Sequence, residues 1–304
     1  MVVLERAPTV TRSMTTRRLV WFSFCVLALL LLAFVELQVW AAVVVLAAAG
    51  LAAVPRLQPS GGHVVDHQDL FVIGALYVAV VAAFRAAFTL FTTDNVLGLF
   101  LCFAAGMLIG VVGPVVYQVW VRGRDLRSLG IGTHEWRPTV AMGLVLAAVQ
   151  FGVTMFGYDM PAAERWVPLL GMSLVVGLFE AVFFRGFVQG RLEASLGPVP
   201  AVIGAAALYA VYHVGYGMDL SEMWFLLGLG VLYAIVFRLT QNVLILWPLL
   251  TPLGAFFNNL DNAAIELPWA SLLGFADVAM LMLAALWIAR RHIRRREPHH
   301  LLAH

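Results

Sequence analysis

Lysine is absent from this sequence, so its positive charge at neutral pH comes from 19 arginines. Charged residues of both signs make up only 12% of the 304 residues, about half of the share in a typical soluble domain. Hydrophobic residues make up 62%, and apolar runs long enough to cross a bilayer recur along the chain. Alternating ten-residue segments, which mark a membrane barrel, are absent. The composition therefore excludes an ordinary soluble domain and predicts an all-α polytopic membrane bundle.

Cysteine is nearly absent as well, and the two that occur, Cys25 and Cys102, lie inside apolar runs. Two isolated thiols give neither a disulfide framework nor a metal site, so both are interpreted as small buried hydrophobic residues. No cleaved signal peptide is expected, because the first apolar run is long and no small-residue cleavage site bounds it. We expect no cofactor and no resident metal.

The apolar runs predict about ten membrane helices. The run at 19–54 exceeds the roughly 20 residues that one span needs, so it is divided at a turn near its two polar residues, Glu36 and Gln38. Eight further spans are expected at about 69–91, 96–121, 139–156, 166–188, 200–216, 223–237, 243–257 and 269–288.

The arginines are distributed unevenly between the two sets of loops. On one side of a ten-span chain lie Arg56, four arginines between 122 and 137, Arg191, Arg238 and the basic tail, whereas the other side has only Arg165. Because positive charge is enriched in cytoplasmic loops, both termini are expected in the cytoplasm. The chain then divides into a cytoplasmic tail (1–18), four membrane helices (19–121), a cytoplasmic amphipathic loop (122–138), a helical core (139–260), a last loop and helix (261–289) and a basic cytoplasmic tail (290–304).

Two ionisable residues, Glu180 and Arg185, stand inside the apolar span at 166–188. An ionised carboxylate in hydrocarbon is costly, so an intramembrane acid is a functional hypothesis by default. The alternative is a structural ion pair or a protonated, hydrogen-bonded carboxyl. The two residues are five apart, roughly 140° around an α-helix, so each is expected to find its partner on another helix.

Further polar residues stand in later spans. His213 follows Tyr209 by one helical turn, and Asn258 and Asn259 follow an apolar, proline-containing run. Taken singly, a membrane histidine is often a packing residue and an asparagine pair is often a helix cap. Together with Glu180, an imidazole can hold and deprotonate water and an amide can stabilise an oxyanion, which are the parts needed for peptide hydrolysis. Zinc would need three protein ligands, and the chain offers one clear His with one Glu.

The order of these residues resembles the CAAX-protease and bacteriocin-processing family of intramembrane endopeptidases. The first motif of that family, E-E-x-x-x-R, matches at Glu180 and Arg185, with Ala181 in the place of the second glutamate. The second motif, F-x-x-x-H, matches from Tyr209 to His213 with an aromatic substitution.

The third motif, H-x-x-x-N, keeps its last residue as Asn258, with Gly254 in the place of the histidine. The resemblance implies that Glu180 is the general base for water and that His213 helps to hold and polarise that water. It implies that Asn258 stabilises the oxyanion and that Arg185 orients the acidic site. Loss of one oxyanion donor costs a factor of about 10² to 10³ in rate, so a slow protease or a silent relative is also compatible with these motifs.

The resemblance covers about residues 120–260 and implies an integral protein of the bacterial inner (plasma) membrane. Its expected partners are the bilayer and a membrane-associated or prenyl-type peptide or protein, with no nucleic acid. Two other classes stay open: a silent relative acting as a scaffold or partner-binding protein, and a transporter, although the two halves show no paired broken helices. The predicted spans also set Glu180 and His213 at depths that differ by roughly 10 Å.

Overall fold

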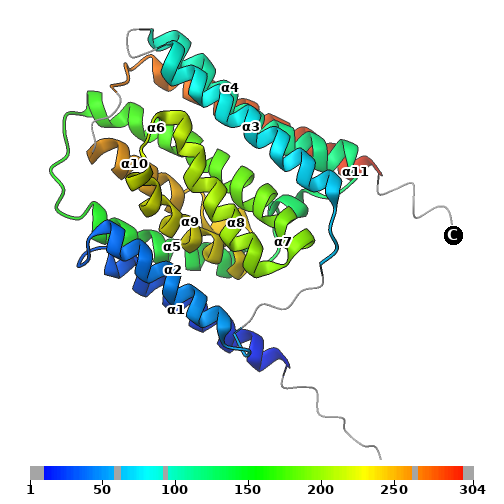
Figure 1. Cartoon of the computed structure of the whole chain (residues 1–304). Helices are drawn as coiled ribbons and strands as arrows, with labels where there is room; N and C mark the ends of the chain where they lie inside the picture. Colours follow the sequence, from blue (N-terminus) through cyan, green and yellow to red (C-terminus); the bar gives the residue numbers. More distant parts are fainter. Residues whose placement is uncertain (1–9, 58–62, 92–94, 262–265, 297–304) are drawn as a thin grey trace, which may run out of the picture.

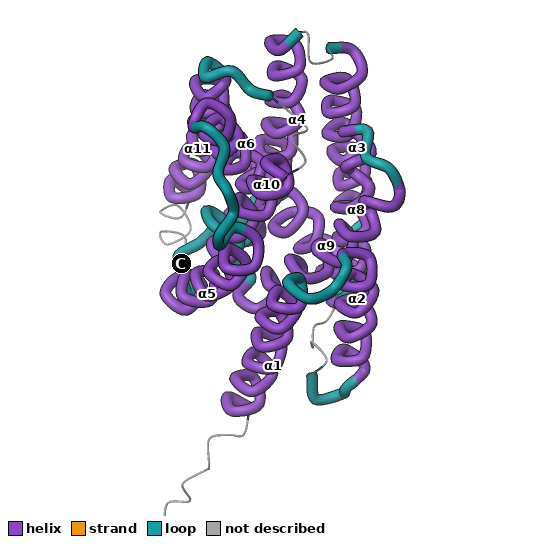
Figure 2. The backbone as a smooth tube through the Cα atoms, turned by 90° about the vertical axis from the view of Figure 1, so that its left-hand side faces the viewer, coloured by secondary structure: helices purple, strands orange, loops and turns teal. Residues whose placement is uncertain are grey.

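Every described secondary-structure element is helical. The computed structural model describes residues 10–57, 63–91, 95–261 and 266–296, and Figure 2 shows helices and loops without a strand in these ranges. This confirms the predicted all-α class. The α-helices are α1 (Val10–Leu31), α2 (Leu37–Ala53), α3 (His67–Leu90), α4 (Val96–Val116), α5 (Trp136–Thr154), α6 (Ala163–Glu180), α7 (Gly190–Leu196), α8 (Pro198–Val211), α9 (Leu220–Thr240), α10 (Leu250–Asp261) and α11 (Ser271–Arg296). Between them lie the π-helices η1 (Tyr117–Val121) and η3 (Ala181–Gln189) and the 3₁₀ helices η2 (Leu126–Leu129), η4 (Tyr212–Tyr216) and η5 (Val243–Ile245).

The helices stack in three layers, which Figure 1 shows edge-on. One outer layer contains α3, α4 and α11, the other contains α1, α2 and α5, and α6 to α10 lie between them. In the middle-layer spans Ala163–Leu196 and Glu222–Thr240, 78% of the most apolar window is buried, against 22% in α3 and α11. The middle layer is therefore where polar side chains are shielded from lipid.

Seven described helices are long and apolar enough to cross a membrane, so the protein is an integral membrane protein. They are His67–Leu90, Val96–Val121, Trp136–Thr154, Ala163–Leu196, Pro198–Tyr216, Glu222–Thr240 and Ser271–Arg295. The apolar α2 has 17 residues, and α10 has only 12 residues, which is about 18 Å at the helical rise. A hydrocarbon core is about 30 Å thick, so α10 does not cross it alone.

The span expected at 243–257 is not one helix, and this prediction was wrong. The short η5 ends at Ile245, and α10 begins only at Leu250. Pro248 lies between them. A proline has no backbone N–H and disfavours the helical conformation in the residue before it, so a continuous helix cannot run through this point without distortion.

The long apolar run at 19–54 is divided as expected. The first helix ends at Leu31 and the second begins at Leu37. Across this hairpin, the indole Nε1 of Trp40 donates a hydrogen bond to the carbonyl oxygen of Ala28 at 2.7 Å. The hairpin packs against α9 and α5 and forms one face of the bundle (Figure 1).

Helices reach into both predicted tails, because α1 begins at Val10 and α11 continues to Arg296. Both of these ends lie toward the same end of the bundle (Figure 1). The remaining tail residues, 1–9 and 297–304, lie outside the described residues, as do 92–94 and 262–265 in two predicted loops.

The segments α6, η3 and α7 form one continuous helical rod from Ala163 to Leu196. A Cβ atom at Gly186 would lie 2.2 Å from the carbonyl oxygen of Leu129, so only glycine allows η2 to cross the rod this closely. Nearer the beginning of the rod, a Cβ atom at Gly177 would lie 2.7 Å from the ring of Pro252. These two close approaches hold the rod between η2 and α10.

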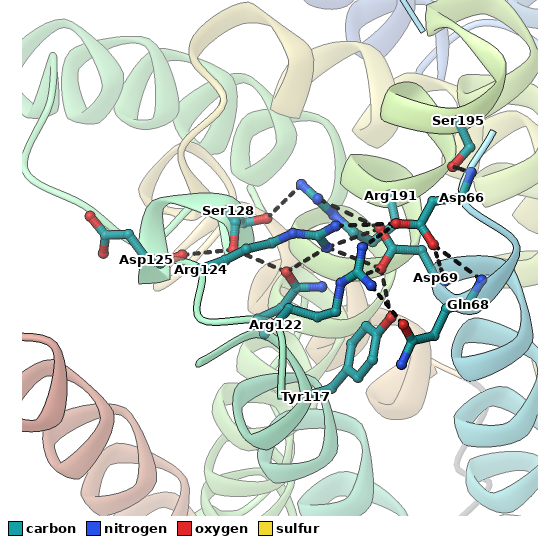
Figure 3. Close-up of polar contacts among 11 residues, drawn as sticks. Asp66, Gln68, Asp69, Tyr117, Arg122, Arg124, Asp125, Ser128, Arg191 and Ser195 are labelled. Carbon is teal, nitrogen blue, oxygen red and sulfur yellow. Dashed lines mark hydrogen bonds and ion pairs between the residues drawn. The ribbon is translucent and has the colours of Figure 1, made fainter. Parts of the chain in front are cut away.

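A polar network joins the beginning of α3 to the segment after α4 and to the end of the rod (Figure 3). Asp66 caps α3, because its Oδ1 accepts hydrogen bonds from the backbone N–H groups of Gln68 and Asp69, each at 3.1 Å. The same carboxylate forms an ion pair with Arg122. An N-cap carboxylate accepts hydrogen bonds from free backbone N–H groups, and its negative charge interacts favourably with the positive end of the helix dipole.

Asp69 is the buried centre of this network, with 1% of its surface exposed. It accepts hydrogen bonds from Tyr117 Oη at 2.7 Å and from Arg124 Nη1 at 2.9 Å. Arg191 Nη1, on the last turn of the rod, lies 3.8 Å from its Oδ2. Arginines that the sequence presented as topology markers are therefore also structural ion-pair partners.

Candidate active site

Glu180 is the last residue of α6 and is 5% exposed. Tyr212 Oη, on η4, donates a hydrogen bond to Glu180 Oε1 at 2.5 Å. The ring of Phe184 packs on that of Tyr212, with centroids 4.7 Å apart. Burying a carboxyl group among aromatic rings is costly unless it is hydrogen-bonded. The prediction that Glu180 has its partner on another helix is confirmed.

The rod changes its helix type immediately after Glu180. The nine residues of η3, which include Arg185, form a π-helix, in which hydrogen bonds join residues five apart. In an α-helix Glu180 and Arg185 would lie about 140° apart, whereas the π repeat brings residues five apart toward the same side. This arrangement differs from the one expected for an α-helix. Segments of π-helix are frequent at functional sites.

Arg185 is 2% exposed, and its guanidinium carbon lies 5.0 Å from the centroid of the Tyr209 ring. A buried cation over an aromatic face gains roughly 2 kcal/mol when it is desolvated. Both Nη atoms are buried and have no hydrogen-bond partner among the described residues. Arg185 is thus positioned by an aromatic ring from another helix, as expected, and keeps unused donor capacity.

His213 lies on η4, the 3₁₀ turn that follows α8, and is 8% exposed. Its Nδ1 lies 2.9 Å from the carbonyl oxygen of Tyr209, which can only accept. Nδ1 is therefore assigned the proton in the neutral ring, and Nε2 is left as an acceptor. This is the nitrogen that could bind a water hydrogen.

Tyr212 connects the acid and the imidazole. Its hydroxyl group is bonded to Glu180, and its ring centroid lies 4.1 Å from that of His213. Among the described residues no hydrogen bond joins Glu180 to His213 directly. The three side chains form one contiguous group, with the tyrosine in the middle.

The expected difference in depth between Glu180 and His213 was wrong. The rod continues to Leu196, eight residues beyond the predicted end at 188. Counted from Gly197 at the turn, Glu180 lies 17 residues back and His213 lies 16 residues forward. At the α-helical rise both distances are about 25 Å, so the two residues lie at one level.

Asn258 lies at a different level. Thr251 Oγ1 donates to the carbonyl oxygen of Gly177 at 3.3 Å, which sets the height of α10 against α6. Farther along α10, Phe256 packs on Trp166 near the beginning of α6, with ring centroids 6.3 Å apart. The helix therefore runs away from the acid, and Asn258 lies about 10 Å beyond Thr251 at the helical rise. Its role as an oxyanion donor stays a prediction.

The third-motif position before Asn258 is closely surrounded by polar groups. A Cβ atom at Gly254 would lie 2.7 Å from Tyr233 Oη and 3.0 Å from Gln150 Nε2. Tyr233 is 2% exposed and Gln150 is 4% exposed. A larger residue at 254 would need the space that these two buried side chains occupy.

Tyr212 is a site residue that was not predicted from the sequence, although its position carries a signal. It directly precedes His213 and stands three residues after Tyr209, so its ring shares a helical face with residues that were noticed. As for metals, no group of three or more His, Cys, Asp or Glu side chains within the described ranges is arranged to hold an ion.

The segment that contains most of these residues matches a known protein family. Residues 161–250 match the family model described as Type II CAAX prenyl endopeptidase Rce1-like. The match spans 90 of the 304 residues and includes Glu180, Arg185 and His213, but it ends before Gly254 and Asn258. The resemblance read from the sequence is confirmed for this segment. No curated protein and no solved structure matches the chain.

Proposed function

From the similarity of residues 161–250 to CAAX prenyl endopeptidases, we propose that this chain is an intramembrane endopeptidase. The observation that supports the proposal most is the environment of Glu180. This acid lies inside the matched segment, is buried in the middle layer, and is hydrogen-bonded by Tyr212 at the level of His213. An ionisable residue held in this way within a membrane bundle is typical of a functional site.

In the proposed reaction, Glu180 takes a proton from a water molecule while the water oxygen attacks the carbonyl carbon of the peptide bond. His213 holds and polarises this water through Nε2, and Arg185 orients the acidic site. The motif assigns the donor to the negative oxygen of the tetrahedral intermediate to Asn258, and this role requires α10 to shift so that Asn258 reaches the level of Glu180. The proton on Glu180 then passes to the leaving amine as the C–N bond breaks, which restores the carboxylate.

The proposed substrate is a membrane-associated or prenyl-type peptide or protein. Residues 161–250 carry the similarity to prenyl endopeptidases, and a buried site suits a substrate that enters from the lipid phase. We further propose cytoplasmic termini and a place in a bacterial inner membrane. The arginine-rich ends of the helices support this orientation.

A catalytically silent relative that serves as a scaffold is the second candidate. Two sequence departures favour it: Ala181 replaces the second glutamate of the first motif, and Gly254 replaces the third-motif histidine. In addition, Glu180 Oε1 already accepts the hydrogen bond of Tyr212, so only part of its acceptor capacity is available to water.

The test is peptide cleavage by the purified protein in liposomes, with farnesylated and unmodified C-terminal peptides as substrates. We expect wild type to cleave and Glu180→Gln to lose at least about 10²-fold in rate, because an amide cannot accept the water proton. The matched control is Glu164→Gln, an exposed acid at the beginning of the same helix, which should retain wild-type activity. A chelator should leave the wild-type rate unchanged, since no metal takes part in the proposed step.

Equal cleavage by wild type and Glu180→Gln would refute the proposed mechanism. If no peptide is cleaved by a folded wild-type protein, the silent relative becomes the better explanation.

A further inference from the structure

A cavity of about 950 Å³ opens between the α1–α2 hairpin and the α8–α9 pair. Its volume is at the upper end of the range for ligand pockets, roughly 300–1,000 Å³. Neither Glu180 nor Tyr212 nor His213 lines it. The α8–α9 pair contributes Val202 and Ile235 to its wall, so the cavity is a separate feature from the site described above.

The cavity exists because α2 and α9 diverge along their length. Near the beginning of α2, the ring of Trp40 packs directly on Phe225, with centroids 5.4 Å apart. Toward the end of α2, Ala52 lines one wall of the cavity, and Ile235 lines it from α9. The two helices therefore touch at one end and stand apart at the other, which leaves a wedge that opens toward the arginine-rich end.

The walls of the wedge are apolar, and the α2 wall is made of small side chains. Four alanines of α2 line it: Ala48, Ala49, Ala52 and Ala53. Faces of small residues normally let two membrane helices approach closely. Here the facing helix stays apart, and the result is an apolar groove whose lining suits acyl chains.

The mouth of the wedge is basic. Arg17, Arg18 and Arg238 all line the cavity, with Glu135 as its one acidic lining residue in the described part of the chain. Arg18 Nη2 lies 2.6 Å from Glu135 Oε2, and Arg238 pairs with Glu193 behind the rim. Among the described residues, three guanidinium groups and two carboxylates therefore gather at this mouth.

We propose that this cavity binds one bilayer phospholipid with an anionic headgroup. Its acyl chains would lie along the alanine wall of α2, and its phosphate would lie at Arg17, Arg18 and Arg238. Basic pockets between membrane helices on the cytoplasmic side are suited to anionic headgroups. A zwitterionic lipid can fill the same apolar wedge, but its headgroup gains less binding free energy from the arginines at the mouth. The inference is independent of whether the Glu180 site is active.

The experiment is native mass spectrometry of the full chain after delipidation, titrated with phosphatidylglycerol or with phosphatidylcholine. We expect one tightly bound phosphatidylglycerol and weaker binding of phosphatidylcholine. Arg17→Gln should weaken phosphatidylglycerol binding about five-fold, as expected for the loss of about 1 kcal/mol at one arginine, and should change phosphatidylcholine binding little.

Two tryptophan substitutions on α2 form a matched pair. Ala52→Trp places an indole inside the wedge and should remove the bound lipid, whereas Ala47→Trp, on the exposed outer face of the same helix, should not. Thermal unfolding of each variant identifies any loss of fold. Ala49→Trp, at a partly open position of the wall, serves as a second blocking variant if Ala52→Trp does not fold.

Equal affinity for the two lipids would overturn the proposal, because the arginine rim would then select nothing. Equal lipid binding by Ala52→Trp and Ala47→Trp would also overturn it, because the lipid would then lie elsewhere. A farnesylated peptide that displaces phosphatidylglycerol from wild type would instead assign the wedge to a peptide substrate. Peptide cleavage is measured separately, so a failure of the proposed function leaves this result unaffected.

Discussion

The hydroxyl group of Tyr212 donates a hydrogen bond to Glu180, and the ring of the same tyrosine packs on His213. One side chain thus holds the acid and fixes the position of the imidazole. Glu180 and Tyr212 are 32 residues apart, so this relationship depends on how the rod packs against α8 and η4. The tyrosine is therefore the residue through which the packing of the bundle sets the geometry of the proposed site.

Replacing Tyr212 with phenylalanine removes this hydrogen bond and keeps the ring. A hydrogen bond to an ionisable group contributes about 1.5–3 kcal/mol, so we expect kcat/KM for peptide cleavage to fall by about ten-fold or more. The matched control is Tyr77→Phe, which removes a hydrogen bond to the carbonyl oxygen of Leu208 but touches neither Glu180 nor His213. If both variants lose the same activity and the same stability, Tyr212 has only a structural role.

Asn258→Ala tests the oxyanion assignment. A donor that acts only in the transition state should lower kcat, by a factor of about 10² to 10³, with little change in KM. The neighbouring Asn259→Ala is the control, because Asn259 Nδ2 donates back to the carbonyl oxygen of Ala255 on its own helix at 2.7 Å. An unchanged kcat in a folded Asn258→Ala protein would contradict the assignment. It would agree with the position of Asn258 on α10, which is far from the level of Glu180.

The contact between Gly186 and η2 predicts a large effect of one methyl group. Gly186→Ala places a Cβ 2.2 Å from the carbonyl oxygen of Leu129 and should destabilise the protein by about 1–3 kcal/mol. At Gly190, one turn along the rod, the nearest atom would be Ser128 O at 3.6 Å, an ordinary contact. Gly190→Ala should therefore be neutral or stabilising by up to about 1 kcal/mol. Thermal unfolding of both variants in detergent checks this, and similar melting temperatures would show that η2 can move away.

The cap at the beginning of α3 predicts a loss of stability in acid. The N–H of Asp69, followed by the guanidinium groups of Arg122 and Arg124, lowers the pKa of Asp66 from its ordinary value. A carboxyl group whose pKa is lowered by folding stabilises the native state above its unfolded pKa of about 3.9, and this contribution is lost as the pH falls through the folded pKa. Asp66→Asn should therefore lower the melting temperature at pH 7 and reduce its dependence on pH below about 5. The exposed Asp159→Asn is the control, and an equal pH dependence in both variants would exclude the cap as the cause.

The orientation of the chain in the membrane can be tested with reporter fusions. The arginine-rich ends predict that the end of α11 is cytoplasmic and that the loop after α5 is on the opposite side. Reporters fused after Gly157 and after Arg296 should therefore report different compartments. The same compartment for both would contradict the proposed orientation.

The helical class and much of the composition of the site follow from the amino-acid sequence alone. In hydrocarbon every backbone N–H and C=O group needs a partner, and a helix supplies these partners within one segment. Apolar runs are therefore enough to predict helices, and rare polar residues within them mark candidate sites. In this way the sequence singled out Glu180, Arg185 and His213, and it also predicted the turn between α1 and α2.

Which of these residues meet, and at which level of the bundle, depends on how the helices pack. The π-helix after Glu180 and the common depth of Glu180 and His213 were not accessible from local pattern. Neither were the hydrogen bond from Tyr212 and the close approach of Gly186 to η2. Each of these depends on contacts between segments that are distant in the chain. Periodicity describes only the face of a single helix, so it cannot identify the partner across an interface.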